Sequence, residues 1–103
     1  MAEFTGKRYI TSGIENEIPA ELQIMMWDMV DKLRHTNQKL DYLQIFVLRP
    51  VRESGVEMQE IVHKQELPWR MKKITVESGS PISAKIFVID NIDYITMLLS
   101  QEY

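Results

Sequence analysis

A single segment of this chain, residues 19–35 (PAELQIMMWDMVDKLRH), carries the pattern of a long amphipathic helix. Pro19 suits the first turn of a helix, where its missing N–H is no loss, and Glu21 and Arg34 complement the helix dipole. At about 100° per residue, one stripe of apolar side chains runs along the helix: Leu22, Met25, Met26, Met29, Val30 and Leu33. The rest of the chain has to supply the surface on which this stripe is buried.

The remaining segments have the β-branched and aromatic content of strands. They are residues 7–14 (KRYITSGI), 41–50 (DYLQIFVLRP), 56–67 (VEMQEIVHKQEL), 71–78 (MKKITVES) and 84–90 (AKIFVID). Residues 41–50 are apolar on both faces, which predicts a central strand covered on two sides. Residues 56–67 are charged on both faces, which predicts an exposed or edge strand. Residues 92–103 fit either a helix or the return strand of a hairpin, and the strand preference of residues 94–96 favours the hairpin.

Together these segments predict a single α+β domain over residues 1–103, in which one long amphipathic helix packs on a mostly antiparallel sheet of about five strands. A length of 103 residues suits one domain with one hydrophobic core. We expect the helix to contribute Leu22, Met26, Met29, Val30 and Leu33 to that core, and the sheet to contribute Leu43, Ile45, Val47, Phe87 and Ile89.

The amino-acid composition excludes several classes of function. The chain has no cysteine and 2 histidines, so disulfides, thiolate metal sites and cysteine nucleophiles are excluded and no metal is expected. The 4 glycines form no phosphate-binding loop, and no cofactor is expected. No apolar run approaches the roughly 18 residues that span a bilayer, and the N-terminus lacks the apolar core of a signal peptide. We therefore expect a cytoplasmic protein with no membrane contact.

His63 is the residue that most suggests an enzyme, as a general acid or base. It lies in EIVHKQE, residues 60–66, with Glu60 and Glu66 close by in sequence. Alternation along a strand places both glutamates on the face opposite His63, so neither pairs with it easily. A solvated edge residue is the simpler interpretation. An enzyme that uses His63 with a carboxylate from another strand remains an alternative.

One basic cluster lies in HKQELPWRMKK, residues 63–73, and it combines Trp69 with Arg70, Lys72 and Lys73. Aromatic and basic side chains together are typical of proteins that bind single-stranded nucleic acid. The pattern is weak here because Glu66 lies inside the cluster and the net charge of -3 gives no basic field. A solvated turn is the simpler interpretation, and a nucleic-acid-associated regulator is the alternative.

The predicted helix also has apolar residues away from its stripe. Ile24 and Trp27 are three residues apart and so are neighbours on the helix surface, with Asp31 and Arg34 close by. Tryptophan is enriched at the energetic centres of protein interfaces. Ile24, Trp27, Asp31 and Arg34 therefore form a candidate patch for a protein partner or a homodimer. The chain's own N-terminal segment or the turn at Pro68 could cover the same residues instead.

Several stretches resemble one known family: RYITSGI, EIPAELQIMMWDMVDKL, DYLQIFVL, IVHKQELP and KIFVIDNIDYITMLLSQEY. They resemble DUF960, a small Firmicutes family of unknown function, and the resemblance covers nearly the whole chain. It implies a bacterial cytoplasmic setting and supplies no activity, cofactor or catalytic residue. Since the residues present no catalytic constellation, we expect a small non-catalytic interaction or regulatory module.

Overall fold

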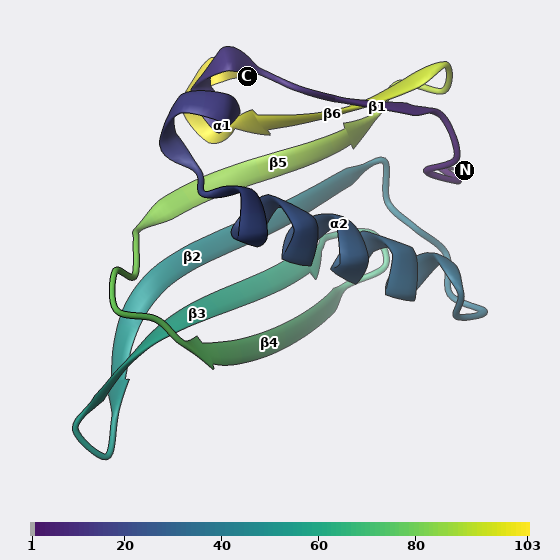
Figure 1. Ribbon diagram of the computed structural model, residues 1–103. Coiled ribbons are helices and arrows are strands. Elements are labelled where there is room, and N and C mark those ends of the chain that lie inside the picture. Colours follow the sequence, from purple (N-terminus) through teal and green to yellow (C-terminus); the bar gives the residue numbers. More distant parts are fainter. Residues whose placement is uncertain (1) are drawn as a thin grey trace.

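A mixed six-stranded sheet forms the centre of the computed structural model, which describes residues 2–103 (Figure 1). The elements in chain order are β1 (Lys7–Ile10), α1 (Ser12–Glu17), α2 (Ala20–Arg34), β2 (Leu43–Glu53), β3 (Val56–Gln65), β4 (Arg70–Glu77), β5 (Ala84–Asp90), β6 (Tyr94–Leu99) and the short 3-10 helix η1 (Ser100–Glu102). The strand order is β1-β6-β5-β2-β3-β4. Among the strand pairs formed by residues 2–103, only β1–β6 is parallel. The α+β class is confirmed, with six strands and two helices in place of about five strands and one helix.

The predicted long helix is confirmed to within one residue at each end. Pro19 is the N-cap of α2 and His35 is its C-cap. Leu22, Met26, Met29 and Val30 are all buried, whereas Leu33 is half-buried. No helix among residues 2–103 has the length and apolar content that crossing a membrane would require.

The start of the chain differs from the prediction, because only the first part of residues 7–14 is a strand. The hydroxyl of Thr11 accepts a hydrogen bond from the backbone N–H of Ile14 (3.3 Å) and so caps α1. Ile14 is completely buried. Thr11 also donates to the carboxylate of Glu102 (2.6 Å), which ties the first helix to the end of the chain.

The prediction that residues 56–67 form an exposed or edge strand is wrong. β3 lies between β2 and β4 and is paired with both. Its polar side chains are buried because they have partners. Gln59, for example, accepts from the backbone N–H of Ile82 (2.7 Å) and donates to the carbonyl of the same residue (3.0 Å).

The favoured hairpin at the end of the chain is confirmed. β6 runs antiparallel to β5, with Asp90 paired to Ile95. The turn between them is held by Asp90, whose carboxylate accepts from the N–H of Ile92 (2.8 Å). The same side chain holds the N-terminal segment, since its other oxygen accepts from the N–H of Phe4 (2.9 Å).

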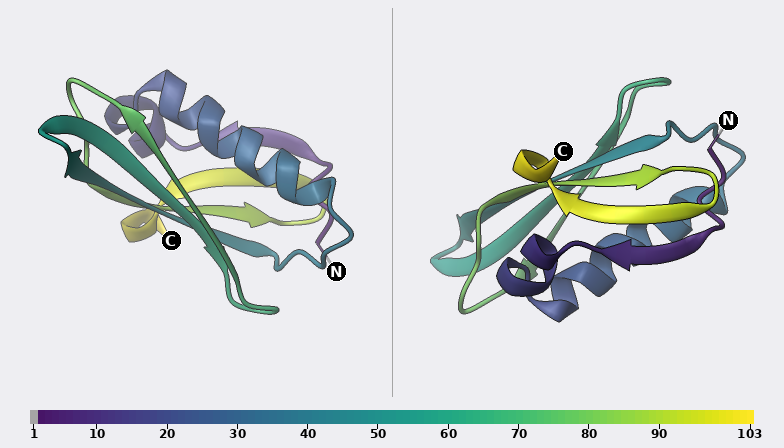
Figure 2. Two further views of the ribbon diagram at one scale, coloured as in Figure 1. Left: turned by 90° about the horizontal axis from the view of Figure 1, so that it is seen from below. Right: turned by 90° about the horizontal axis from the view of Figure 1, so that it is seen from above.

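The predicted core is correct for the helix except at the half-buried Leu33. On the sheet, Ile45 and Ile89 are buried as predicted, but the face that packs against the helices is the other one. Both α1 and α2 lie on one side of the sheet (Figure 2), which we call the inner face. Its core side chains on the central strands are Phe46, Leu48, Ile86 and Val88. The predicted residues Leu43, Ile45, Val47, Phe87 and Ile89 alternate with these and belong to the opposite side, which we call the outer face. Residues 41–50 are therefore a central strand with a helix over one face only.

The outer face continues across four strands. In addition to the five residues just named, it includes Val62 of β3 and Leu98 of β6, which pair across the strands with Val47 and Phe87. At one end the ring of Tyr103 packs edge-on against Phe87, with 5.5 Å between ring centroids. Leu43, Val47, Val62 and Phe87 remain only half-buried, whereas Ile45, Ile89 and Leu98 are buried.

Candidate functional site

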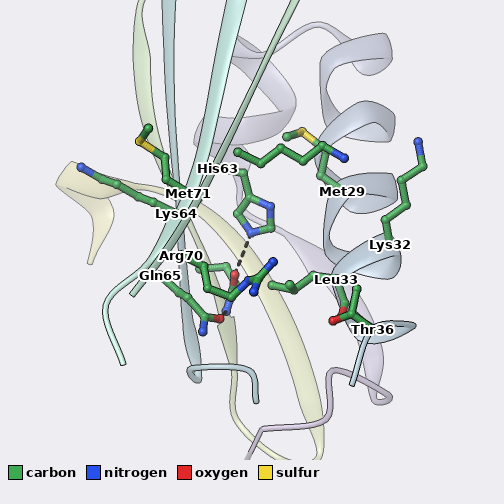
Figure 3. Close-up of a pocket in the computed structure, with 11 residues that line it drawn as sticks. Met29, Lys32, Leu33, Thr36, His63, Lys64, Gln65, Arg70 and Met71 are labelled. Carbon is green, nitrogen blue, oxygen red and sulfur yellow. Dashed lines mark hydrogen bonds between the residues drawn. The ribbon is translucent and has the colours of Figure 1, made fainter. Parts of the chain in front are cut away.

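A small pocket opens between the C-terminal half of α2 and the strands β3 and β4 (Figure 3). Its volume is about 110 Å³, several times the roughly 10–15 Å³ that one water requires. Met29 and Leu33 of α2 form one wall, and His63 lies opposite them. None of the pocket's lining residues is acidic, although Lys32, Arg70 and Lys72 are among them.

The strand register explains how these side chains meet. His63 lies directly across from Phe46 on β2 and from Lys72 on β4. Its ring stacks on that of Phe46, with centroids 4.4 Å apart and planes inclined by 13°. Gln65 and Arg70 form the next pair on the inner face. Two cationic side chains of one strand therefore border the histidine at successive inner positions.

A chain of amide hydrogen bonds begins at Gln65, which is completely buried. Its side-chain nitrogen donates to the carbonyls of Lys39 (3.0 Å) and Pro68 (2.8 Å). Its oxygen accepts from the N–H of Asp41 (3.1 Å) and from the side-chain nitrogen of Gln44 (2.9 Å). The backbone groups fix the orientation of this amide, because a flipped amide would set its oxygen against two carbonyl oxygens.

The fixed amide of Gln65 orients the side chain of Gln44, and Gln44 in turn determines which nitrogen of His63 carries the proton. Its nitrogen donates to Gln65 and to the carbonyl of Asp41 (2.8 Å), so its oxygen faces Nε2 of His63 at 2.7 Å as an acceptor. His63 must then carry its proton on Nε2. The other ring nitrogen, Nδ1, is left with an unshared lone pair and points toward α2, into the pocket (Figure 3).

The charge state of His63 follows from the same surroundings. Burial, the largest cause, and the charges of Lys72 and Arg70 together lower its pKa to about 4. The ring is therefore uncharged at neutral pH. The expectation of a solvated edge residue is wrong, since His63 is only 6% exposed. A hydrogen-bond acceptor in a cationic pocket is what this arrangement provides.

Within residues 2–103, His63 forms no hydrogen bond with a carboxylate that could assist it as an acid or base. Its Nε2 donates instead to the amide oxygen of Gln44. Glu60 lies on the outer face, as strand alternation predicts, and its carboxylate accepts from Nε of Arg49 (2.5 Å). This hydrogen bond from Arg49 holds the pKa of Glu60 below its usual value. Across the same part of the chain, no three acidic or histidine side chains come together as metal ligands.

The basic cluster predicted from sequence is divided between two faces. Arg70 and Lys72 are inner-face residues that line the pocket, whereas Lys73 lies on the outer face, 3.9 Å from the carboxylate of Glu60. Trp69 precedes β4 and is 62% exposed. The four side chains therefore do not form one continuous binding surface.

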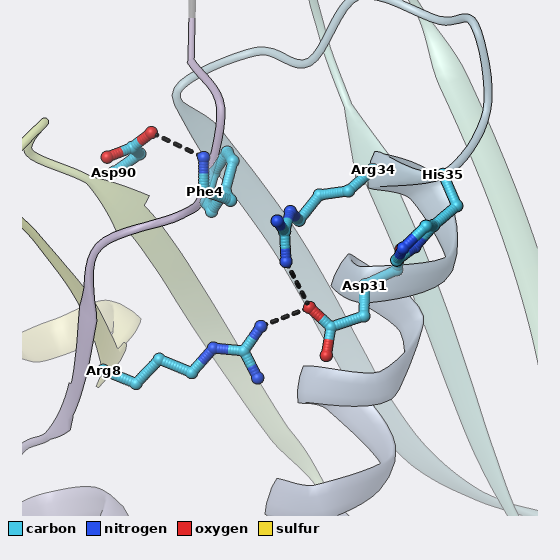
Figure 4. A network of polar contacts seen from close by, with 6 residues as sticks. All are labelled: Phe4, Arg8, Asp31, Arg34, His35 and Asp90. Carbon is cyan, nitrogen blue, oxygen red and sulfur yellow. Dashed lines mark hydrogen bonds and ion pairs between the residues drawn. The ribbon is translucent and has the colours of Figure 1, made fainter.

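Part of the candidate patch on α2 is covered by Arg8 of the chain itself, and Figure 4 shows the contact of Arg8 with Asp31. The guanidinium of Arg8 lies 4.8 Å from the centre of the Trp27 ring, and Trp27 is half-buried. Arg8 also donates to Asp31, which accepts a second hydrogen bond from Arg34 (3.1 Å). Burial raises the pKa of Asp31, but the bonds from the two arginines outweigh it and leave the pKa below its usual value. Ile24 stays 67% exposed.

The outer face was not singled out as a site by its sequence, yet it gathers aromatic and basic side chains. Tyr9 and Tyr94 are 51% and 45% exposed and contact each other edge-on, 6.0 Å between ring centroids. The ammonium of Lys85 lies 5.8 Å from the centre of the Phe87 ring. The sequence does contain a signal for this face. Residues 41–48 are apolar on both sides, and one long helix can cover only one of these sides.

Comparisons with known proteins agree with the fold and give no activity. The model of a family described as "Staphylococcal protein of unknown function (DUF960)" matches residues 7–102. The structure is similar to a crystal structure of a protein of unknown function from Enterococcus faecalis, with a TM-score of 0.73 and 21% sequence identity over 100% of this chain and 97% of that chain. No curated protein matches the sequence.

Proposed function

We propose that this chain, which belongs to the DUF960 family, is a small non-catalytic cytoplasmic module that binds a protein partner through the outer face of its sheet. The observation that carries the proposal is the one-sided arrangement of the helices: α1 and α2 cover the inner face, and the outer face keeps its apolar side chains. An apolar layer with no helix packed over it, in which Leu43, Val47, Val62 and Phe87 stay half-exposed, is typical of a contact surface.

The continuity of the outer face supports this role. Scattered apolar residues are normal on any protein surface, but here Val62, Val47, Phe87 and Leu98 follow one another across β3, β2, β5 and β6. Tyrosine and phenylalanine at its border add side chains that are enriched at protein interfaces.

Charge favours a different protein over a second copy of the chain. Lys64 and Lys85 lie directly across from the outer-face apolar residues Ile45 and Val47, and neither forms an ion pair with another residue of the range 2–103. Two outer faces packed on each other would bring these ammonium groups together, whereas an acidic border on a partner would complement them. The patch around Ile24 is the alternative surface, but it offers one exposed apolar residue beside side chains that are already paired.

The test is partner capture from an extract of the source organism with tagged wild-type protein and two matched variants. Val47→Glu places a charge on the outer face, and Ile24→Glu places the same charge on the exposed side of α2. We expect one partner to bind the wild type and Ile24→Glu, to be lost with Val47→Glu, and to be released by added salt. Circular dichroism and urea unfolding of each variant check that it is folded.

Three results would contradict this proposal. A partner lost only with Ile24→Glu would move the contact to α2. A purified wild type that sediments as a dimer, with Val47→Glu a monomer, would make the outer face a homodimer contact. Capture that depends on bound nucleic acid and is abolished by nuclease would favour the nucleic-acid-associated regulator.

A further inference from the structure

We propose that the pocket between α2 and strands β3 and β4 binds a small oxyanion that carries its own hydroxyl group, of which the hydrogen-bearing forms of phosphate are the simplest example. The proposal is independent of the outer face, since the pocket lies on the opposite side of the sheet. It depends on one acceptor atom held among cationic side chains.

The acceptor is Nδ1 of His63, and it cannot easily become a donor. The proton of the ring is committed to Nε2 by the oxygen of Gln44, and Gln44 is oriented by Gln65 and by the carbonyl of Asp41. If the proton were on Nδ1 instead, two hydrogen-bond acceptors, Nε2 of His63 and the side-chain oxygen of Gln44, would face each other. Among residues 2–103 every fully buried side-chain nitrogen and oxygen has a partner, so Nδ1, which has none, is open to the pocket, where the O–H of a ligand can reach it.

The cations are Arg70 and Lys72, and neither forms an ion pair with a residue in the described range 2–103. Lys72 lies across from His63 and is exposed at the pocket, and Arg70 lies across from Gln65 and is half-buried. Of the other two lysines of the lining, Lys32 is paired with Asp28 at 3.0 Å, and Lys64 is a residue of the outer face. Two unpaired cations on the inner face and no acidic lining residue favour a ligand with negative charge.

The negative end of the α2 dipole also lies near the pocket and would oppose an anion. It is partly compensated by the chain itself, because the hydroxyl of Thr36 donates to the carbonyl of Leu33 (2.7 Å) and its N–H donates to the same carbonyl (3.1 Å). The carbonyl that would otherwise face a ligand at this wall is thus already bonded.

These features select among anions. A fully ionised oxyanion such as sulfate satisfies the cations but turns an oxygen lone pair toward the lone pair of Nδ1. A hydrogen-bearing phosphate satisfies the same cations with its ionised oxygens and donates its O–H to Nδ1. The pocket should therefore distinguish two tetrahedral anions of similar size by a single proton.

The experiment is a titration of the isotope-labelled full chain with inorganic phosphate and with sulfate near pH 6.5 at constant ionic strength, followed by NMR of the His63 ring. We expect phosphate to bind about tenfold more tightly than sulfate, the ratio that one such hydrogen bond gives. Lys72→Gln should weaken both anions by a similar factor. Lys73→Gln, its neighbour on the outer face, is the matched control and should weaken neither.

His63→Phe keeps the ring stack on Phe46 and removes the acceptor, so it should abolish the preference for phosphate. If this variant does not fold, nitrogen-15 shifts of the wild-type ring answer the same question: the ring should be protonated at Nε2, and phosphate alone should shift Nδ1. The proposal is overturned if sulfate binds as tightly as phosphate, if Nδ1 is the protonated nitrogen, or if neither anion shifts the ring at about 10 mM, where a millimolar site would be mostly filled.

Discussion

Replacement of Phe46 by alanine is expected to lower the free energy of unfolding by about 3–5 kcal/mol, the usual range for a buried phenylalanine. Phe46 is fully buried in the core between the sheet and the helices. It also supports the His63 ring at 4.4 Å, so the variant loses apolar burial and leaves a cavity beside a polar network. Urea unfolding curves with an unchanged m-value give the loss directly.

Phe87→Ala is the matched control, because it makes the same chemical change on the outer face. Phe87 is half-buried, so less apolar surface returns to water, and the loss should be no more than about half of that at Phe46. An equal or larger loss at Phe87 would show that the layer covering the sheet lies over the outer face, as the sequence had predicted.

Acid should destabilise the protein through His63. The pKa of this residue is lowered from 6.5 to about 4. Between these two pH values, His63 is protonated in the unfolded chain and unprotonated in the folded chain. The contribution of His63 to the free energy of unfolding is therefore fully present above pH 6.5. It decreases as the pH drops toward about 4, and protonation of His63 causes no further loss below that value. The total effect is about 3 kcal/mol at most, since each pKa unit corresponds to 1.36 kcal/mol.

The charged groups that face His63 are Lys72 and Arg70 from β4 and Lys32 from α2, all cations that keep their charge over this range. Carboxylates such as Asp31 and Glu60 lose their ion pairs at lower pH, so the interval from pH 6.5 to 5 reports mainly on the histidine. Urea unfolding of wild type and His63→Phe at several pH values measures the difference. A wild-type slope in this interval that persists in His63→Phe would contradict the assignment.

The long helix could be predicted from sequence because its signals are local. Residues 19–35 combine a 3.6-residue apolar period with Pro19 at the start, and both are read within the segment itself. α1 has only 6 residues, too short for a period to appear. Its cap at Thr11 was the available signal. The contact with Glu102 that supports the cap joins the two ends of the chain.

The face of the sheet that meets the helix could not be predicted, because residues 41–48 are apolar on both sides. Which of the two faces packs against the helices depends on a polar residue, Gln44, which lies on the inner face and is completely buried there. It is acceptable at that position only because Gln65, Asp41 and His63 satisfy its amide. That set of bonds depends on the register of β2 against β3, which a pattern within one strand does not contain.

The pocket was missed for the same reason. β3 reads as polar on both faces and therefore as an edge strand, yet His63 and Gln65 are buried as members of one hydrogen-bonded network. The candidate patch on α2 was defined by helical spacing alone. Its cover by Arg8 comes from β1, which is placed there by parallel pairing with β6, at the other end of the sequence.

The most direct test of the account is the reactivity of single cysteines on the two faces of β2, which is clean because the chain has no cysteine of its own. Val47→Cys lies on the half-exposed outer face, and Leu48→Cys lies on the buried inner face. With a small thiol reagent under native conditions, Val47→Cys should react without unfolding. Leu48→Cys should react only when the chain opens, slower by about a thousandfold or more. Equally slow reaction at both positions, at every protein concentration, would show that the outer face is covered within the chain and would contradict the account.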